Sequence, residues 1–193
     1  LANLLVSANQ GTLSITATDL EVELVARAPI KSTADGQITI PGRKFLDICR
    51  TLPADATLSV SQDADKVTVK AGKSRFVLAT LPATDFPVIE ELAQQQTLKL
   101  AQADLRRLLD KTHFSMAQQD VRYYLNGMLL ETDGKMLRTV ATDGHRLALC
   151  EMDLPGKAQG QQVIIPRKGV LELQRLLGTE GDVAITIGSN HVR

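Results

Sequence analysis

Long apolar runs, net charge and paired cysteines are what this sequence lacks. No stretch of the 193 residues approaches the roughly 18 consecutive apolar residues that a membrane-spanning helix needs. The formal charge is zero, with 22 basic and 22 acidic residues, so any affinity for nucleic acid must come from where the charges lie. The two cysteines, Cys49 and Cys150, lie far apart and form no CxxC or Cys/His spacing. They argue against a structural zinc site and predict buried free thiols in a reducing compartment.

The composition that remains is ordinary for a globular protein. With 44% hydrophobic and 23% charged residues, disorder is not expected. A chain of this length holds one large domain or two of about 100 residues each. Prolines and a polar glutamine run interrupt the regular patterns between residues 81 and 96, and this segment predicts a domain boundary.

Alternating apolar and polar residues predict strands in both halves, and apolar residues three and four apart predict helices. In the first half we expect strands at 3–6, 12–17, 20–24, 37–40, 57–61, 66–70 and 75–80, and a helix over 41–52. In the second half we expect a strand at 97–100 and then a helix over about 103–114, whose inner face carries Leu105, Leu108, Leu109 and Thr112. The segment 121–150 reads as two further strands.

The sequence repeats itself. Leu5, Leu13, Ala17, Thr18 and Asp19 recur as identical residues 124 positions later, as Leu129, Leu137, Ala141, Thr142 and Asp143. Further matches, such as Ile40-Pro41 with Ile165-Pro166, are 125 apart, and pairing Val22 with Leu147 places the added residue within 144–146. The ordered matches predict two copies of one α+β domain with mostly antiparallel strands.

A catalytic site is the first hypothesis for the segment 121–150. Asp143 and His145 would share a face of a strand and could act as a general-base pair in a hydrolase or transferase. No nucleophile elbow, phosphate-binding loop or metal-ligand cluster accompanies them, and His113 and His191 have no identifiable partner. A turn aspartate beside a surface histidine is the favoured interpretation, and Asp19 at the matching position of the first copy supports it.

Three predicted helices carry basic residues along one side. These residues are Arg43, Lys44 and Arg50, then Arg106, Arg107 and Lys111, then Arg167, Lys168 and Arg175. Each set alone is typical of a solvated face. If the three helices line one side, they form a surface that meets phosphates without reading bases. The adjacent Tyr123 and Tyr124 would point to opposite faces of a strand, so one could be core and the other a surface contact.

Three strings of residues resemble one known family. Arg122-Tyr123-Tyr124-Leu125-Asn126-Gly127, Thr139-Val140-Ala141-Thr142-Asp143-Gly144-His145-Arg146-Leu147 and Ile165-Pro166-Arg167-Lys168-Gly169 are similar to the bacterial sliding clamp family, the beta subunit of DNA polymerase III. The resemblance covers essentially the whole chain. Residues 1–93 would be most of the first clamp domain and 94–193 most of the second, with an N-terminal segment and a third domain outside this sequence.

The resemblance implies a duplicated DNA-clamp fold, with antiparallel sheets outside and helices lining a DNA-facing side. It implies a cytoplasmic DNA polymerase processivity factor that is not itself an enzyme and needs no metal or cofactor. The full-length subunit would form a homodimeric ring around double-stranded DNA without sequence specificity. DNA polymerase and clamp-loader subunits would bind it through short peptide motifs. The rival from another class is the hydrolase or transferase using Asp143 and His145, and a general nucleic-acid binder is a third possibility.

The resemblance also implies three sets of site residues. The DNA contacts would be Arg43, Gln119, Tyr123 and Tyr124, with Gln118 next to them undetermined. The partner-peptide cleft would comprise Arg122, Leu125, Thr142, Gly144, His145, Arg146 and Leu147. The subunit interface would comprise Lys44, Ile48, Lys73, Arg75, Phe76 and Leu78, on a helix and on an edge strand able to pair with another subunit.

Overall fold

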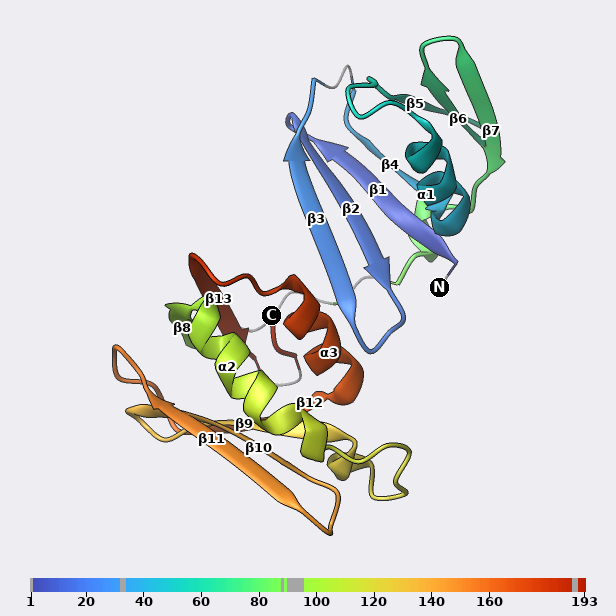
Figure 1. Cartoon of the computed structure of the whole chain (residues 1–193). Coiled ribbons are helices and arrows are strands. Elements are labelled where there is room, and N and C mark those ends of the chain that lie inside the picture. The colour runs from blue at the N-terminus through green and yellow to red at the C-terminus, as the bar shows by residue number, and fades with distance from the viewer. Residues whose placement is uncertain (1, 32–33, 88, 90–95, 189–190) are drawn as a thin grey trace. The chain divides into compact units, whose positions relative to one another are not determined.

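The computed structural model describes residues 2–31, 34–87, 89, 96–188 and 191–193. The chain divides into two compact units, 1–89 (unit 1) and 90–193 (unit 2), each described here by itself (Figure 1). Among the described residues, no helix is long and apolar enough to cross a membrane.

Unit 1 combines two antiparallel sheets and one helix. The larger sheet has the order β3-β2-β1-β4, from β1 (Asn3–Asn9), β2 (Thr12–Thr18), β3 (Glu23–Pro29) and β4 (Gly36–Pro41). Helix α1 (Gly42–Thr51) follows, and then the sheet β5-β6-β7, from β5 (Ser59–Asp63), β6 (Lys66–Ala71) and β7 (Ser74–Ala79). The buried core joins both sheets to the helix through Val6, Ile40, Ile48, Val67 and Val69.

Unit 2 packs two helices on an antiparallel sheet. The sheet has the order β11-β10-β9-β12, from β9 (Gly127–Thr132), β10 (Met136–Thr142), β11 (Leu147–Asp153) and β12 (Gln161–Pro166). Around it lie α2 (Gln102–Thr112), α3 (Arg167–Leu176) and the pair β8 (Gln96–Ala101) with β13 (Asp182–Ile187). Helices α2 and α3 contact each other and cover the sheet (Figure 1).

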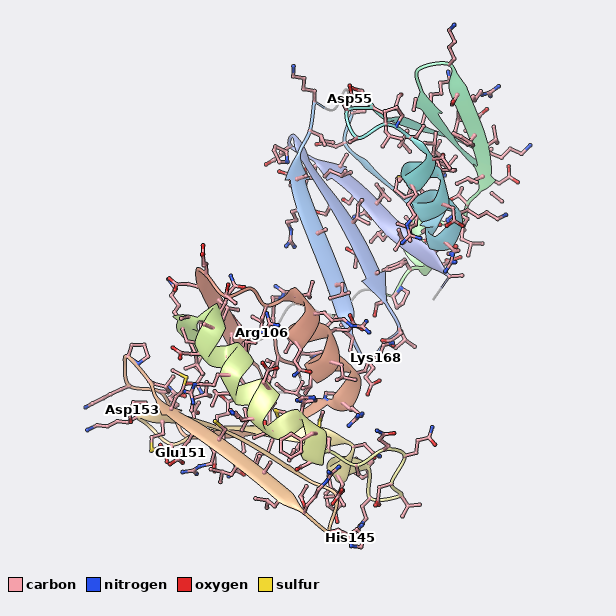
Figure 2. All side chains as sticks on the ribbon, in the orientation of Figure 1. Asp55, Arg106, His145, Glu151, Asp153 and Lys168 are labelled. Carbon is pink, nitrogen blue, oxygen red and sulfur yellow. The ribbon has the colours of Figure 1, made fainter. Side chains whose placement is uncertain are left out.

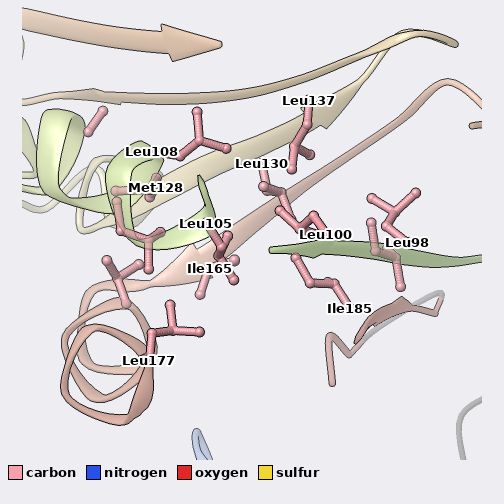
Figure 3. Packing of buried hydrophobic residues seen from close by; sticks show 14 of the residues in the cluster. Leu98, Leu100, Leu105, Leu108, Met128, Leu130, Leu137, Ile165, Leu177 and Ile185 are labelled. Carbon is pink, nitrogen blue, oxygen red and sulfur yellow. The ribbon is translucent and has the colours of Figure 1, made fainter. Parts of the chain in front are cut away.

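The inner face predicted for α2 is confirmed. Leu105, Leu108, Leu109 and Thr112 are all buried, and the three leucines enter a core that reaches Met128, Leu130 and Leu137 of the sheet (Figure 3). Burying one such leucine stabilises the fold by about 1.5–3 kcal/mol relative to leaving it exposed. This packing fixes α2 on the sheet and so fixes the loop that follows it.

The predicted duplication is confirmed. Both units repeat one strand order, and α1 and α3 are ten-residue helices that each begin directly after a proline. The predicted position of the added residue is wrong, however. The β2–β3 hairpin pairs Thr18 with Glu23, and the β10–β11 hairpin pairs Thr142 with Leu147, so the offset stays at 124 through both turns. The added residue lies later, where 154–160 connects β11 to β12 and the shorter 30–35 connects β3 to β4.

Two other predictions are wrong in ways that matter for the site. The third strand of unit 1 exists but does not begin at residue 20: Leu20 is 70% exposed in a turn, and β3 begins at Glu23. The segment 121–150 is not two strands but a 3₁₀ turn, Tyr123–Leu125, followed by β9, β10 and the start of β11. At both places the chain folds as a turn closed by a backbone hydrogen bond, from the Asp19 N–H to the Val22 carbonyl and from the Leu125 N–H to the Arg122 carbonyl, with side-chain hydrogen bonds to the backbone beside them.

Candidate functional site

The turn between β10 and β11 is built by the side chains of Thr142 and Asp143. Asp143 Oδ1 accepts hydrogen bonds from the backbone N–H groups of His145 and Arg146, both at 3.0 Å. Thr142 Oγ1 accepts from the Gly144 N–H at 3.1 Å and donates to the Arg146 carbonyl at 2.7 Å. The backbone hydrogen bonds lower the pKa of Asp143, so it is held as a structural carboxylate.

His145 lies exposed at the tip of this turn (Figure 2). The favoured interpretation, a turn aspartate beside a surface histidine, is confirmed. Asp143 and His145 do not share a strand face, because both lie in the turn rather than on a strand.

Unit 1 contains the same turn. Asp19 Oδ1 accepts from the N–H groups of Glu21 at 3.2 Å and Val22 at 2.9 Å, and Thr18 Oγ1 donates to the Val22 carbonyl at 3.1 Å. Leu20 has φ +79°, as Gly144 has φ +88° at the matching position of unit 2. The Thr-Asp pair is therefore scaffold in both units, and unit 2 differs by substitution, not by insertion.

Arg122 lies against this turn from the preceding loop. Its Nε and Nη2 donate to the two carboxylate oxygens of Asp120 at 3.0 and 2.9 Å. The pair lowers the pKa of Asp120 to about 2, with the Arg122 N–H and the charge of His145 adding to the effect. A Cβ placed on Gly144 would lie 3.2 Å from Arg122 Nη2, so glycine allows the guanidinium to lie on the turn. The structure thus places Arg122 against Gly144, the residue before His145, and the binding of a partner peptide by these residues stays a prediction.

Arg146 lies on the other side of the turn. It pairs with Asp143 through Nε at 3.0 Å, and its Nη2 donates to the Phe114 carbonyl at 2.7 Å. Its guanidinium carbon lies 5.9 Å from the centre of the Phe114 ring, and that ring is half exposed. Of the two leucines predicted for the cleft, Leu147 is 63% exposed, whereas Leu125 is buried.

The residues predicted to contact DNA are exposed. Tyr123 is 82% and Tyr124 50% exposed, and their rings meet edge to face with centres 5.9 Å apart. The expectation that one tyrosine could be core is wrong, because a 3₁₀ turn projects both outward. Gln118 and Gln119 are exposed beside them, and Gln119 has φ +57°. In unit 1, Arg43 is exposed on α1 and lies 3.7 Å from Asp47.

Several of the basic helix residues also hold the fold together. Arg106 donates to the Leu177 carbonyl at 3.1 Å, and Arg167 donates to the Met116 carbonyl at 3.3 Å. Arg175 pairs with Glu172 at 3.0 Å. Figure 2 shows Arg106 and Lys168 on α2 and α3 of unit 2. Some of the basic side chains on these helices therefore already bind backbone carbonyls or an acidic side chain.

The proposed interface residues of unit 1 differ in exposure. Strand β7 is an outer strand of its sheet, paired with β6. Lys44 on α1, and Lys73 and Arg75 in and after the β6–β7 turn, are exposed, whereas Phe76 and Leu78 are half-buried against the core. Ile48 is 8% exposed and belongs to the core.

Sequence reasoning did not select Asp120, Asn126 or Phe114. Asp120 stands two residues before Arg122, a spacing that could have indicated the pair. The side chain of Asn126 forms hydrogen bonds across the loop to the backbone of Asp120, and no sequence pattern predicts this contact. Among the described residues, no group of three or more His, Cys, Asp or Glu side chains could hold a metal ion.

Comparisons with known proteins identify relatives for both units. Residues 1–90 match the family model described as DNA polymerase III beta subunit, N-terminal domain, and residues 99–193 match its central domain. The beta sliding clamp of Pseudomonas aeruginosa is 54% identical over 196 residues, covering 100% of this chain and 53% of the relative. That of Escherichia coli K12 is 51% identical over 195 residues, with 100% and 53% covered. The chain thus spans about half the length of these relatives.

Solved structures of sliding clamps also match this chain over its whole length. A crystal structure of the DNA polymerase III subunit beta from Pseudomonas aeruginosa matches with a TM-score of 0.95 at 54% identity, over 100% of this chain and 54% of that chain. A sliding clamp from the same organism, bound to griselimycin, matches with a TM-score of 0.93 at 52% identity, over 100% and 53%. A DNA polymerase sliding clamp from Caulobacter crescentus matches with a TM-score of 0.92 at 39% identity, over 100% and 54%.

Proposed function

This chain belongs to the DNA polymerase III beta subunit family, and from that membership we propose that it is part of a DNA sliding clamp. The full-length subunit would close into a homodimeric ring around duplex DNA in the cytoplasm and act as a processivity factor without catalysing a reaction. The observation that carries the proposal is the match of two successive family domains to the two units of the chain. We propose that these units are the first two domains of the subunit.

Duplex DNA would be met by exposed side chains without base readout. Arg43, Gln119, Tyr123 and Tyr124 are exposed, and a protein that slides should hold phosphates diffusely. The zero net charge, and the hydrogen bonds of Arg106 and Arg167 to backbone carbonyls, support a weak contact with DNA. The closed ring, rather than affinity for DNA, would then keep the clamp on the duplex.

Partner proteins would bind at the β10–β11 turn. Leu147 offers exposed apolar surface, Arg146 precedes it in the chain, and Arg122 lies against Gly144 of the same turn, an arrangement that suits a short peptide with an apolar anchor. We expect polymerase and clamp-loader peptides to contact Thr142, Gly144 and His145 as well. A relative bound to griselimycin supports a ligand site on such clamps.

The subunit interface would use the outer strand β7. Open backbone groups on this strand can pair with another subunit, and exposed Lys44, Lys73 and Arg75 favour an acidic partner surface. Phe76 and Leu78 would add apolar contact, while Ile48 would support α1 from the core.

A peptide titration tests the partner site. Adding a peptide with the clamp-binding motif of a bacterial replicative polymerase to the labelled chain should shift NMR signals of Arg122, Gly144, His145 and Leu147. His145→Ala should weaken the binding. The matched control is Glu21→Ala, because Glu21 occupies the equivalent position in the unit 1 turn.

The rival functions predict different results. A hydrolase or transferase would show turnover that disappears in His145→Ala, and such turnover would refute the clamp assignment. A general nucleic-acid binder would show strong, salt-sensitive affinity for linear DNA. A titration in which the peptide shifts no signal at the β10–β11 turn would remove the proposed partner site.

A further inference from the structure

One amide side chain closes the loop that carries residues of both proposed sites. Asn126 Oδ1 accepts a hydrogen bond from the Asp120 N–H at 2.9 Å, and Asn126 Nδ2 donates to the Asp120 carbonyl at 2.8 Å. The Asn126 N–H donates to the Tyr123 carbonyl at 3.0 Å. Both ends of the loop 120–126 are thereby tied together.

The contact requires an amide of this length. A donor and an acceptor must stand side by side to match one residue's N–H and carbonyl, and at neutral pH the Asn and Gln side chains carry that pair, whereas an ionised carboxylate does not. An ionised aspartate would face the Asp120 carbonyl with a second acceptor, and alanine would leave both backbone groups unpaired.

The closed loop sets the direction of the functional side chains. With Asp120 held, its carboxylate accepts from the Arg122 backbone N–H at 2.8 Å and from the guanidinium, which lies on Gly144. Within the same loop the 3₁₀ turn exposes Tyr123 and Tyr124. The orientation of Arg122 therefore depends on the backbone position that Asn126 fixes.

Comparison with unit 1 separates the effect of Asn126 on the loop from a role in folding. In unit 2 the Asn126 carbonyl accepts from the Arg167 N–H, the first residue of α3, at 2.9 Å. In unit 1 the Ala2 carbonyl accepts from the Gly42 N–H, the first residue of α1, also at 2.9 Å. Ala2 matches Asn126 at the offset of 124, so this hydrogen bond between strand and helix forms without an asparagine side chain.

We propose that Asn126 is a positioning residue that holds Arg122 on Gly144 and both tyrosines in their exposed orientation. The proposal rests on the proposed function for what Arg122 and the tyrosines bind, but the orientation itself can be measured without a ligand. The chain has two tyrosines and no tryptophan, so its intrinsic fluorescence reports on this loop alone.

The first experiment compares the wild-type chain with Asn126→Ala. Losing two backbone contacts should loosen the loop, so tyrosine fluorescence anisotropy should fall, and affinity for the polymerase peptide should weaken about tenfold. The control is Asn3→Ala, which removes another partly buried asparagine contact, to Thr39 in unit 1 at 3.0 Å, and should leave both readouts unchanged.

The second experiment uses Asn126→Asp and pH. A protonated carboxyl can accept from the Asp120 N–H and donate to its carbonyl, so lowering the pH from about 7 to about 3, below the ordinary aspartate pKa of about 3.9, should restore anisotropy and peptide affinity relative to wild type. Asp120, Arg122, Arg167 and His145 are the charged or titratable groups around this position. They are present in both chains, so the ratio of variant to wild type isolates residue 126.

The outcomes separate the two proposals. Wild-type chain that binds no peptide contradicts the proposed function, while anisotropy still decides the role of Asn126. Unchanged anisotropy in Asn126→Ala, or no recovery of Asn126→Asp at low pH, overturns the positioning role. An Asn126→Ala chain that fails to fold overturns it too, since Asn126 would then be a folding residue.

Discussion

Gly144 and Leu20 occupy the same left-handed position in two copies of one turn, yet their surroundings differ. Leu20 projects into solvent and is 70% exposed, so unit 1 accepts a side chain there despite the backbone cost. At Gly144 the space that a Cβ would need is taken by the Arg122 guanidinium. The glycine of unit 2 thus avoids the backbone cost and also leaves room for the Arg122 guanidinium.

Replacing Gly144 with alanine should therefore do two things. The positive φ should cost about 1–2 kcal/mol of unfolding free energy, and the Cβ should displace Arg122. Urea unfolding measures the first effect, and the Arg122 Nε–H signal in NMR measures the second. Gly72→Ala is the control, because Gly72 has φ +56° but no atom within 4 Å of the added Cβ. An Arg122 signal that stays in place in Gly144→Ala would contradict the contact.

The Asp120–Arg122 pair predicts a pH dependence. The pair lowers the pKa of Asp120 from its ordinary 3.8 to about 2, so the unfolded chain binds this proton more tightly than the folded chain. The stabilisation is fully present above the ordinary value and is lost as the pH falls through about 2. Subtracting the urea midpoint of Asp120→Asn from that of wild type should give a positive difference near neutral pH that shrinks below pH 3.8. A difference independent of pH would contradict the ion pair.

At the scale of elements, α2 determines where the site begins. Its inner face anchors it to β10 and β11, and the chain continues directly into Phe114 and the loop 120–126. The core leucines of α2 hold the helix on the sheet, and Phe114 lies two residues after the helix ends. The packing of α2 and the position of Arg146 on the Phe114 ring are therefore linked.

Leu108→Ala tests this packing. Leu108 is fully buried, and truncating a buried leucine costs about 2–5 kcal/mol through lost burial and the cavity left behind. Lys111→Ala, on the exposed side of the same helix, should change the unfolding free energy by less than about 0.5 kcal/mol. Equal effects of the two substitutions in urea unfolding would contradict the assigned inner face.

At the scale of the whole molecule, the chain consists of two units with separate cores. The buried cluster of unit 2 has 15 residues and extends through both helices and both sheets, while that of unit 1 joins its helix to its two sheets through five. Stability follows the apolar area buried, so unit 1 should open more readily than unit 2.

Amide hydrogen exchange measures this difference. Protected amides of β6 in unit 1 should exchange faster than those of β9 and β10 in unit 2. Tyrosine fluorescence, which reports on unit 2 only, should then change at higher urea than a signal averaged over both units. Identical protection in the two units would mean that they unfold together.

The sequence by itself determined the repeat, the antiparallel α+β class and the inner face of α2, because these depend on periodicity and on identical residues at a fixed offset. It also determined that Asp143 is a turn residue, since Asp19 occupies the matching place. It could not locate the added residue, because the chemistry of the turn changes from Leu20-Glu21-Val22 to Gly144-His145-Arg146 without a change in length.

Only the tertiary structure decided what the segment around Tyr123 does. Asn126 reaches back to Asp120, and Arg122 reaches across to Gly144, so side chains rather than strand periodicity set the local conformation. Such contacts join positions whose spacing carries no pattern, so the predicted strand at this point was wrong. For the same reason Tyr123 and Tyr124 both face solvent, and Arg122 stands beside the β10–β11 turn.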